Sequence, residues 1–136
     1  MAEPGTPRQI PLVDYLRLGR RPHLRANECV GCGARYFDRR NACARCGATD
    51  FKGATVKNRG VVKSFTIVHR AAPGIPVPYV SAIVETDDGT SVRSNVVNCP
   101  PDPESVELGM KVKLTTYPIG SDDDGTEAIA FGYEPA

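Results

Sequence analysis

Four of the five cysteines lie in two Cys-x-x-Cys-Gly motifs, and this spacing limits the possible folds more than any other feature of the chain. The motifs span residues 29–33 and 43–47. A Cys-x-x-Cys turn places two thiolates on one side of a tight loop, and a second such turn completes a tetrahedron around one cation, usually zinc. The glycine that ends each motif permits the left-handed backbone that the turn requires. We therefore predict one structural Zn²⁺ site with the ligands Cys29, Cys32, Cys43 and Cys46.

Two disulfides, a redox-active dithiol and an iron site are the alternatives for these cysteines. Disulfides suit exported proteins, whereas residues 1–4 show no signal pattern. A redox dithiol needs only one motif and usually a βαβ context. Iron suits the same four thiolates, so the choice between zinc and iron stays open at this point. Four protein ligands leave no position for water or substrate, so the metal is expected to support the fold and to do no chemistry.

Charge is distributed unevenly along the 136 residues. Residues 1–48 carry a net charge of +5, and residues 49–136 carry −4. A basic half that contains the cysteines beside an acidic half suggests two small modules. No apolar run approaches the length of a membrane span, and cysteines that bind zinc persist in the cytosol, so we expect a cytoplasmic protein.

The basic half is predicted to contain a disordered tail, a short helix and a zinc ribbon. Residues 1–9 are rich in Pro, Gly and Thr and form the expected tail, and residues 10–50 hold the helix and ribbon. Pro11 suits the first position of a helix and Gly19 suits its end. A helix of two turns is too short to be stable alone, so it must dock on the ribbon or on a partner. Its apolar face is predicted to comprise Leu12, Tyr15 and Leu16.

Within the acidic half, residues 51–136 are the expected barrel and alternate polar and apolar residues in five runs that are typical of strands. The expected strands lie near residues 59–68, 79–85, 90–97, 112–116 and 127–131. In the first of them, alternation places Val61, Phe65 and Ile67 on one face and Val62 on the other. A short helical turn is expected at residues 103–108. Five strands with a helical connection between the third and fourth favour an OB-type barrel over the competing sandwich.

Candidate catalytic residues are few. His23, His69 and Cys99 stand alone in the sequence, and Cys99 is followed by two prolines instead of the basic neighbours that activate a thiol. The hydrolase, zinc-protease and phosphate-loop motifs are absent from the sequence. The chain alone is therefore not expected to be an enzyme.

The ordered set of features resembles the zinc-ribbon/OB-fold acyl-CoA-associated proteins, a family also called domain of unknown function 35. The resemblance covers roughly residues 10–134 and rests on the helix residues, the two cysteine motifs, residues 60–66, 78–79 and 108–112, and Phe131. It implies a small, mainly β protein with an N-terminal short helix, a rubredoxin-like zinc ribbon and a five-stranded OB-fold barrel.

The resemblance also implies a non-catalytic accessory subunit that binds and stabilises a thiolase-like enzyme acting on acyl-CoA, in a hetero-oligomer. The expected partners are acyl-CoA thiolases, lipid-transfer-type thiolases or retro-aldolases of steroid or fatty-acid side-chain metabolism. The predicted partner-binding residues are Leu12, Tyr15, Leu16, Arg20, Arg21 and Tyr79. The candidates for contact with CoA phosphates are Arg25, Arg35, Arg39 and Arg40.

Two other functions compete with this reading. Zinc ribbons and OB barrels also bind single-stranded nucleic acid, although the barrel half carries −4 and few aromatic residues on its second and third strands. An enzyme that acts directly on acyl-CoA is the third possibility.

Overall fold

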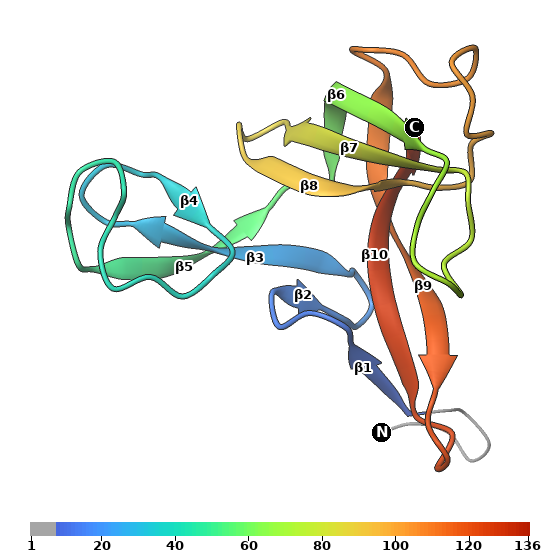
Figure 1. Ribbon diagram of the computed structural model, residues 1–136. Helices are drawn as coiled ribbons and strands as arrows, with labels where there is room; N and C mark the ends of the chain where they lie inside the picture. The colour runs from blue at the N-terminus through green and yellow to red at the C-terminus, as the bar shows by residue number, and fades with distance from the viewer. Residues whose placement is uncertain (1–7) are drawn as a thin grey trace.

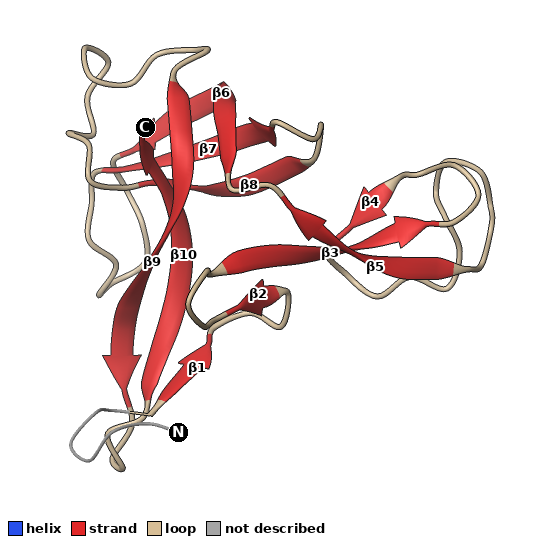
Figure 2. Cartoon of the chain, turned by 180° about the vertical axis from the view of Figure 1, so that it is seen from behind, coloured by secondary structure: helices blue, strands red, loops and turns tan. Residues whose placement is uncertain are grey.

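The computed structural model describes residues 8–136, and within them the chain forms ten β-strands and no helix (Figures 1 and 2). Residues 1–7, most of the predicted disordered tail, lie outside the described part. Gln9, the last residue of that predicted tail, belongs to strand β1 (Gln9–Pro11). No helix able to cross a membrane occurs in residues 8–136.

The C-terminal module is a closed five-stranded barrel. Its strands are β6 (Arg59–Val68), β7 (Tyr79–Thr86), β8 (Ser91–Val96), β9 (Lys111–Ser121) and β10 (Glu127–Pro135). They lie in the order β10-β8-β7-β6-β9, and β9 pairs again with β10, which closes the sheet. The β8–β10 pair is parallel and the other barrel pairs are antiparallel. This arrangement confirms the predicted OB-fold barrel and excludes the sandwich.

The N-terminal module is a small second sheet that projects from the barrel (Figure 1). It contains β2 (Leu16–Arg17), β3 (His23–Cys29), β4 (Arg35–Tyr36) and β5 (Phe51–Val56). The central strand β3 pairs with each of the other three, all antiparallel. The loops at the far end of this sheet carry the two cysteine motifs, as expected for a zinc ribbon.

The predicted N-terminal helix is wrong. Strand β1 instead adds to β10 in parallel, and the Leu12 N–H donates to the Ile129 carbonyl at 2.7 Å. A turn follows, and β2 then brings Leu16 into the core with none of its surface exposed. Two helical turns are marginal alone, so backbone pairing with β10 and burial of Leu16 outweigh the local helical pattern.

The expected helical turn between the third and fourth barrel strands is present as one hydrogen-bonded turn, in which the Val106 N–H donates to the Asp102 carbonyl at 3.2 Å, but it does not extend into a helix. The turn comprises residues 103–105, and the Asp102 carboxylate caps it by accepting hydrogen bonds from the N–H groups of Glu104 and Ser105 at 3.1 and 2.8 Å. The turn delivers Val106 into the core, where it is almost completely buried.

One apolar core unites the two modules. Leu16, Leu24 and Val56 at the base of the ribbon belong to the same buried cluster as Val84 and Tyr133 of the barrel. The base of the ribbon is therefore part of the barrel's packing, while its metal-bearing end extends away from it.

A β-bulge in β6 changes which residues face this core. The register with β7 shifts between Val62 and Ser64, so the face changes at Lys63. Val62 is fully buried, and Phe65 and Ile67 pack against the same core. The prediction that Val61 shares a face with Phe65 and Ile67 is wrong, because simple alternation does not survive one inserted residue.

Candidate metal centre

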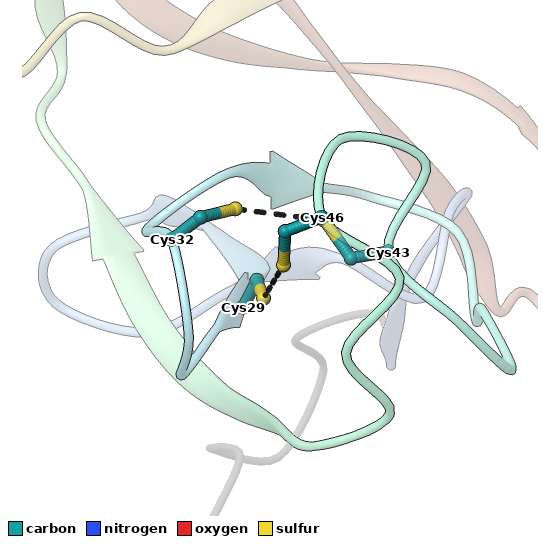
Figure 3. Close-up of side chains that lie close together, drawn as sticks. All are labelled: Cys29, Cys32, Cys43 and Cys46. Atoms are coloured by element: carbon teal, nitrogen blue, oxygen red, sulfur yellow. Dashed lines mark hydrogen bonds between the residues drawn. The ribbon is translucent and has the colours of Figure 1, made fainter.

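The four cysteines of the two motifs converge at the far end of the ribbon (Figure 3). All four Sγ atoms lie within 4.8 Å of one another. The Cys29 and Cys46 Sγ atoms are 3.5 Å apart, and those of Cys32 and Cys43 are 3.6 Å apart. Each short contact joins one motif to the other, as expected when both motifs share one ion.

Both motifs adopt the same backbone geometry. In the first, the Cys29 N–H donates to the Ala34 carbonyl at 2.8 Å, and the Gly33 N–H donates to the Cys29 carbonyl at 2.9 Å. The second motif repeats these bonds between Cys43 and Ala48 and between Gly47 and Cys43, at 2.7 and 2.8 Å. Gly33 and Gly47 both have φ = +79°, a conformation that side chains with a Cβ rarely adopt.

The geometry fits tetrahedral zinc. A Zn–S distance of about 2.3 Å at tetrahedral angles separates the sulfur atoms by about 3.8 Å, close to the two short distances in the cluster. The four thiolates would complete the coordination shell, so this donor set would hold a structural ion rather than one that binds substrate.

The electrostatics of the thiols also fit a cation. Hydrogen bonds from the Tyr36 hydroxyl and from backbone N–H groups lower the pKa of Cys43 to about 6. A backbone hydrogen bond from Ala48 acts to lower the pKa of Cys46, but the three neighbouring cysteines raise it to about 12. Without a cation, one thiolate therefore suppresses ionisation of a neighbouring thiol. A divalent ion would offset the repulsion between the negative charges and allow all four thiols to ionise.

The predicted partner-binding residues at the N-terminus have different environments. Leu12 is 53% exposed, and Arg20 and Arg21 are exposed, so their predicted role stays open. Leu16 is fully buried, so its prediction as a surface contact is wrong. Tyr15 is half-buried at the ribbon–barrel junction, with its ring centroid 4.8 Å from that of Phe37 and 5.7 Å from that of Phe131.

Arg35 joins the ribbon to the barrel instead of facing solvent. Its Nε lies 3.0 Å from Glu28 Oε1, and its Nη1 lies 2.9 Å from Asp88 Oδ2 and 3.0 Å from Thr90 Oγ1. Asp88 also accepts a hydrogen bond from the Lys57 N–H at 2.9 Å. The Arg35 guanidinium is thus paired with groups of this chain, so we remove Arg35 from the candidates for CoA contact.

The ionisation of Asp88 reflects the same junction. Burial acts to raise the pKa of Asp88, but hydrogen bonds from Thr86, the Lys57 N–H, Thr90 and Arg35 lower it well below its usual range. Local patterns in the sequence do not reveal this junction, because Arg35 and Asp88 are 53 positions apart. The acidic turn at residues 87–89 was the only local signal.

The other three arginine candidates do not share one environment. The Arg25 guanidinium lies over Gly53, where an added Cβ would collide with it. The Arg40 guanidinium lies 4.1 Å from the centre of the Tyr36 ring, and its Nε lies 3.3 Å from Asp38 Oδ1. Arg39 is exposed. Their contact with CoA stays a prediction.

The isolated candidates for catalysis remain unconnected. No hydrogen bond found within residues 8–136 joins Cys99 to a histidine, and the Cys99 Sγ contacts the Ser105 carbonyl at 3.5 Å. Burial and the charge of Asp102 both raise the pKa of Cys99. The His23 Nδ1 lies 3.0 Å from the Arg21 carbonyl, and His69 is exposed at the end of β6.

The fold and the four-thiolate site define a two-module protein with a structural metal ribbon and an OB barrel. Comparison with known families agrees: residues 17–52 match the ChsH2 rubredoxin-like zinc ribbon domain, and residues 54–116 match the ChsH2 C-terminal OB-fold domain. The chain belongs to this DUF35 family, which confirms the resemblance noted from the sequence.

Two archaeal relatives are similar to the chain over most of its length. Both are described as DUF35 domain-containing scaffold proteins. The one from Methanocaldococcus jannaschii is 34% identical over 110 residues, which cover 78% of this chain and 75% of the relative. The one from Methanothermobacter thermautotrophicus is 28% identical over 125 residues, which cover 89% of this chain and 92% of the relative.

A solved structure shares both modules. A chain of the Ltp2-ChsH2(DUF35) aldolase superposes with a TM-score of 0.63 and is 27% identical, over 83% of this chain and 84% of that one. The similarity thus spans the ribbon and the barrel together.

Proposed function

We propose that this chain is a non-catalytic accessory subunit that binds and stabilises a thiolase-like enzyme acting on acyl-CoA. The two form a hetero-oligomer in the cytoplasm. The ribbon and barrel, which share one apolar core, form the scaffold, the zinc ion holds the ribbon, and the catalytic residues belong to the partner.

One observation carries this proposal: the likeness to a chain of the Ltp2-ChsH2(DUF35) aldolase extends over 83% of the chain, through both modules. The archaeal relatives, which are called scaffold proteins, support the same role. The four-cysteine cluster adds to this support, because a metal with four thiolate ligands has no free position for a substrate.

The proposed reaction of the complex is carbon–carbon bond cleavage or formation on an acyl-CoA, in the shortening of steroid or fatty-acid side chains. The support is the family resemblance and the aldolase named in the related structure. The chain's part in this reaction is to complete and stabilise the partner's active site.

The test is reconstitution. The tagged chain is purified from its native cell, a co-purifying thiolase-like enzyme is identified by mass spectrometry, and both proteins are then produced separately. Thiolysis and retro-aldol cleavage of acyl-CoA esters are measured for each protein and for the mixture. We expect activity, or a stable active enzyme, only in the mixture. Turnover by the isolated chain, or a partner equally active and stable without it, would overturn the proposal.

The nucleic-acid alternative has less support. The barrel half carries −4, which repels a phosphate backbone. The barrel does present two tyrosines, Tyr79 and Tyr117, on one groove, and aromatic rings there favour base stacking. A strongly salt-dependent mobility shift with single-stranded DNA would favour this alternative.

A further inference from the structure

An open groove of about 820 Å³ crosses the face of the OB barrel formed by β7 and β8. One wall is the loop after β6, and the other is the distal part of β9. Its main lining residues are Ile75, Tyr79, Arg93, Asn95, Tyr117 and Ile119. Tyr79 was predicted from the sequence to contact a partner, whereas the other residues come together only in the fold.

A second, smaller hollow adjoins the groove. This hollow of about 260 Å³ shares Ser81 and Arg93 with the groove and reaches Phe65 on β6. Neighbouring strands lie about 4.8 Å apart, so a path over β8, β7 and β6 is about 10 Å long. An extended peptide rises about 3.3 Å per residue, so this path matches about three residues of an extended segment.

The groove walls are apolar and unusually exposed. Ile75 and Ile119, on opposite walls, are 49% and 52% exposed, and Val77 in the same loop is 43% exposed. The loop from Ala71 to Pro78 contains three prolines, which restrict its backbone before binding. Exposed branched side chains on a restricted loop are typical of a surface that a partner covers.

A single positive charge lies on the floor of this groove. Arg93 faces Ile83 across the β7–β8 pair and so has no acidic residue opposite it. Glu85, the next outward-facing acid on β7, lies 3.4 Å from Lys63. None of the ion pairs within residues 8–136 includes Arg93. Its guanidinium is therefore free for a carboxylate.

We propose that this groove docks an extended segment of the partner enzyme in which one carboxylate lies between apolar side chains. The carboxylate pairs with Arg93, and the apolar side chains cover Ile75 and Ile119. This inference rests on the proposed function and names the surface through which the barrel carries it out.

Charge distinguishes this occupant from a polyanion. A nucleic-acid strand or a CoA molecule brings several phosphates, but among residues 8–136 Arg93 is the only charged residue that lines the groove. The loop after β9, the strand that carries Ile119, also holds three consecutive aspartates, Asp122 to Asp124, which repel a polyanion. One carboxylate among apolar groups matches the single arginine.

The experiment uses the full chain and the thiolase-like enzyme identified by reconstitution. The dissociation constant of the complex is measured by isothermal titration calorimetry for Arg93→Glu and Ile119→Ser. The matched controls are Lys111→Glu, an equal charge change at an exposed site outside the groove, and Leu108→Ser, an exposed apolar residue outside it. Thermal melting of each variant verifies its fold. We expect both groove variants to bind at least about tenfold more weakly, while both controls bind as the parent chain does.

A photo-cross-linking amino acid at Ile119 then identifies the docked segment, with the same probe at Leu108 as the control. Cross-links from Ile119 to a partner segment that contains Asp or Glu between apolar residues support the proposal. A complex that forms with unchanged affinity in both groove variants, or that cross-links from Leu108 but not from Ile119, overturns the groove and leaves the proposed function intact. Failure to form any complex with a thiolase-like enzyme overturns the proposed function itself.

Discussion

Leu12 and Leu16 are the same residue type, four positions apart, but the tertiary structure gives their side chains very different exposure to solvent. The helical pattern assigned both to one exposed face, but the structure leaves Leu12 53% exposed and buries Leu16 completely. Leu16 belongs to the cluster that joins the ribbon to the barrel. The two leucines therefore form a matched pair for testing the N-terminal segment.

We predict that Leu16→Ala lowers the free energy of unfolding by about 2–5 kcal/mol, because it leaves a cavity in the core. Leu12→Ala is predicted to change it by less than about 0.5 kcal/mol, because that side chain is mostly in water. Urea unfolding followed by tyrosine fluorescence measures both. Equal effects of the two substitutions would contradict the burial of Leu16.

At the metal centre, we predict that Cys43→Ser abolishes zinc binding and unfolds the metal-bearing end of the ribbon. Zinc contributes about 10–16 kcal/mol to the folding of small zinc-finger peptides, far more than the few apolar contacts at that end can replace. Zinc content by mass spectrometry and amide spectra of residues 29–50 test this. Cys99→Ser, outside the cluster, is the control and should keep its zinc. A Cys43→Ser chain with full zinc content and an unchanged ribbon spectrum would refute the four-ligand site.

At the scale of secondary-structure elements, Arg35 on β4 links the ribbon to the β7–β8 turn of the barrel. Arg35 contacts Glu28 within the ribbon and Asp88 in the turn. Hydrogen bonds from Arg35 and then from Lys52 lower the pKa of Glu28, and the pKa of Asp88 is also held below its usual range. Both carboxylates are therefore stabilised in their charged form by folding.

This link predicts an acid-dependent loss of stability. A carboxylate with a depressed folded pKa stabilises the fold above its unfolded pKa of about 4, and the contribution disappears as the pH falls through the folded pKa. Arg35→Met should therefore lower the melting temperature at pH 6–7, and the difference from the parent chain should shrink below about pH 4. Arg39→Met, at an exposed site, is the control. A difference that stays constant down to pH 2 would show that Arg35 acts through packing alone.

The elements also show where sequence patterns succeed and fail. The five barrel strands were predicted because each alternates over its own length, and each was found near its expected position. The helix predicted at residues 11–18 does not form, because the backbone of this segment hydrogen-bonds to β10 and the Leu16 side chain is buried in the core. The bulge in β6 was missed because it depends on the register with β7, a partner eleven or more residues away.

At the scale of the whole molecule, the two modules share one core but differ in what stabilises them. The barrel closes through β9–β10 pairing and supplies most residues of the shared core, whereas the end of the ribbon depends on the four cysteines. Removal of zinc should therefore act on one end of the molecule first.

We predict that a strong zinc chelator removes the folded amide signals of residues 29–50 while those of β6–β10 persist. Partner binding should weaken at the same time if the partner contacts both modules. Amide exchange or nuclear magnetic resonance spectra recorded before and after chelation test this, and re-addition of zinc should restore the ribbon. Cooperative unfolding of the whole chain upon chelation would show that the barrel has no independent stability.

The amino-acid sequence by itself determined the metal ligands and the barrel, because both follow from local spacing: two Cys-x-x-Cys-Gly turns make the ligand set, and alternation within each run makes the strands. Only the tertiary structure determined the conformation of the N-terminal segment, the ion pair of Arg35 with Asp88 and the groove around Arg93. Each of these depends on groups far apart in the chain, whose hydrogen bonds, ion pairs and burial exist only once β10, the β7–β8 turn and β9 have reached their places. Local propensity amounts to a fraction of a kcal/mol per residue, so such long-range contacts override it wherever the two disagree.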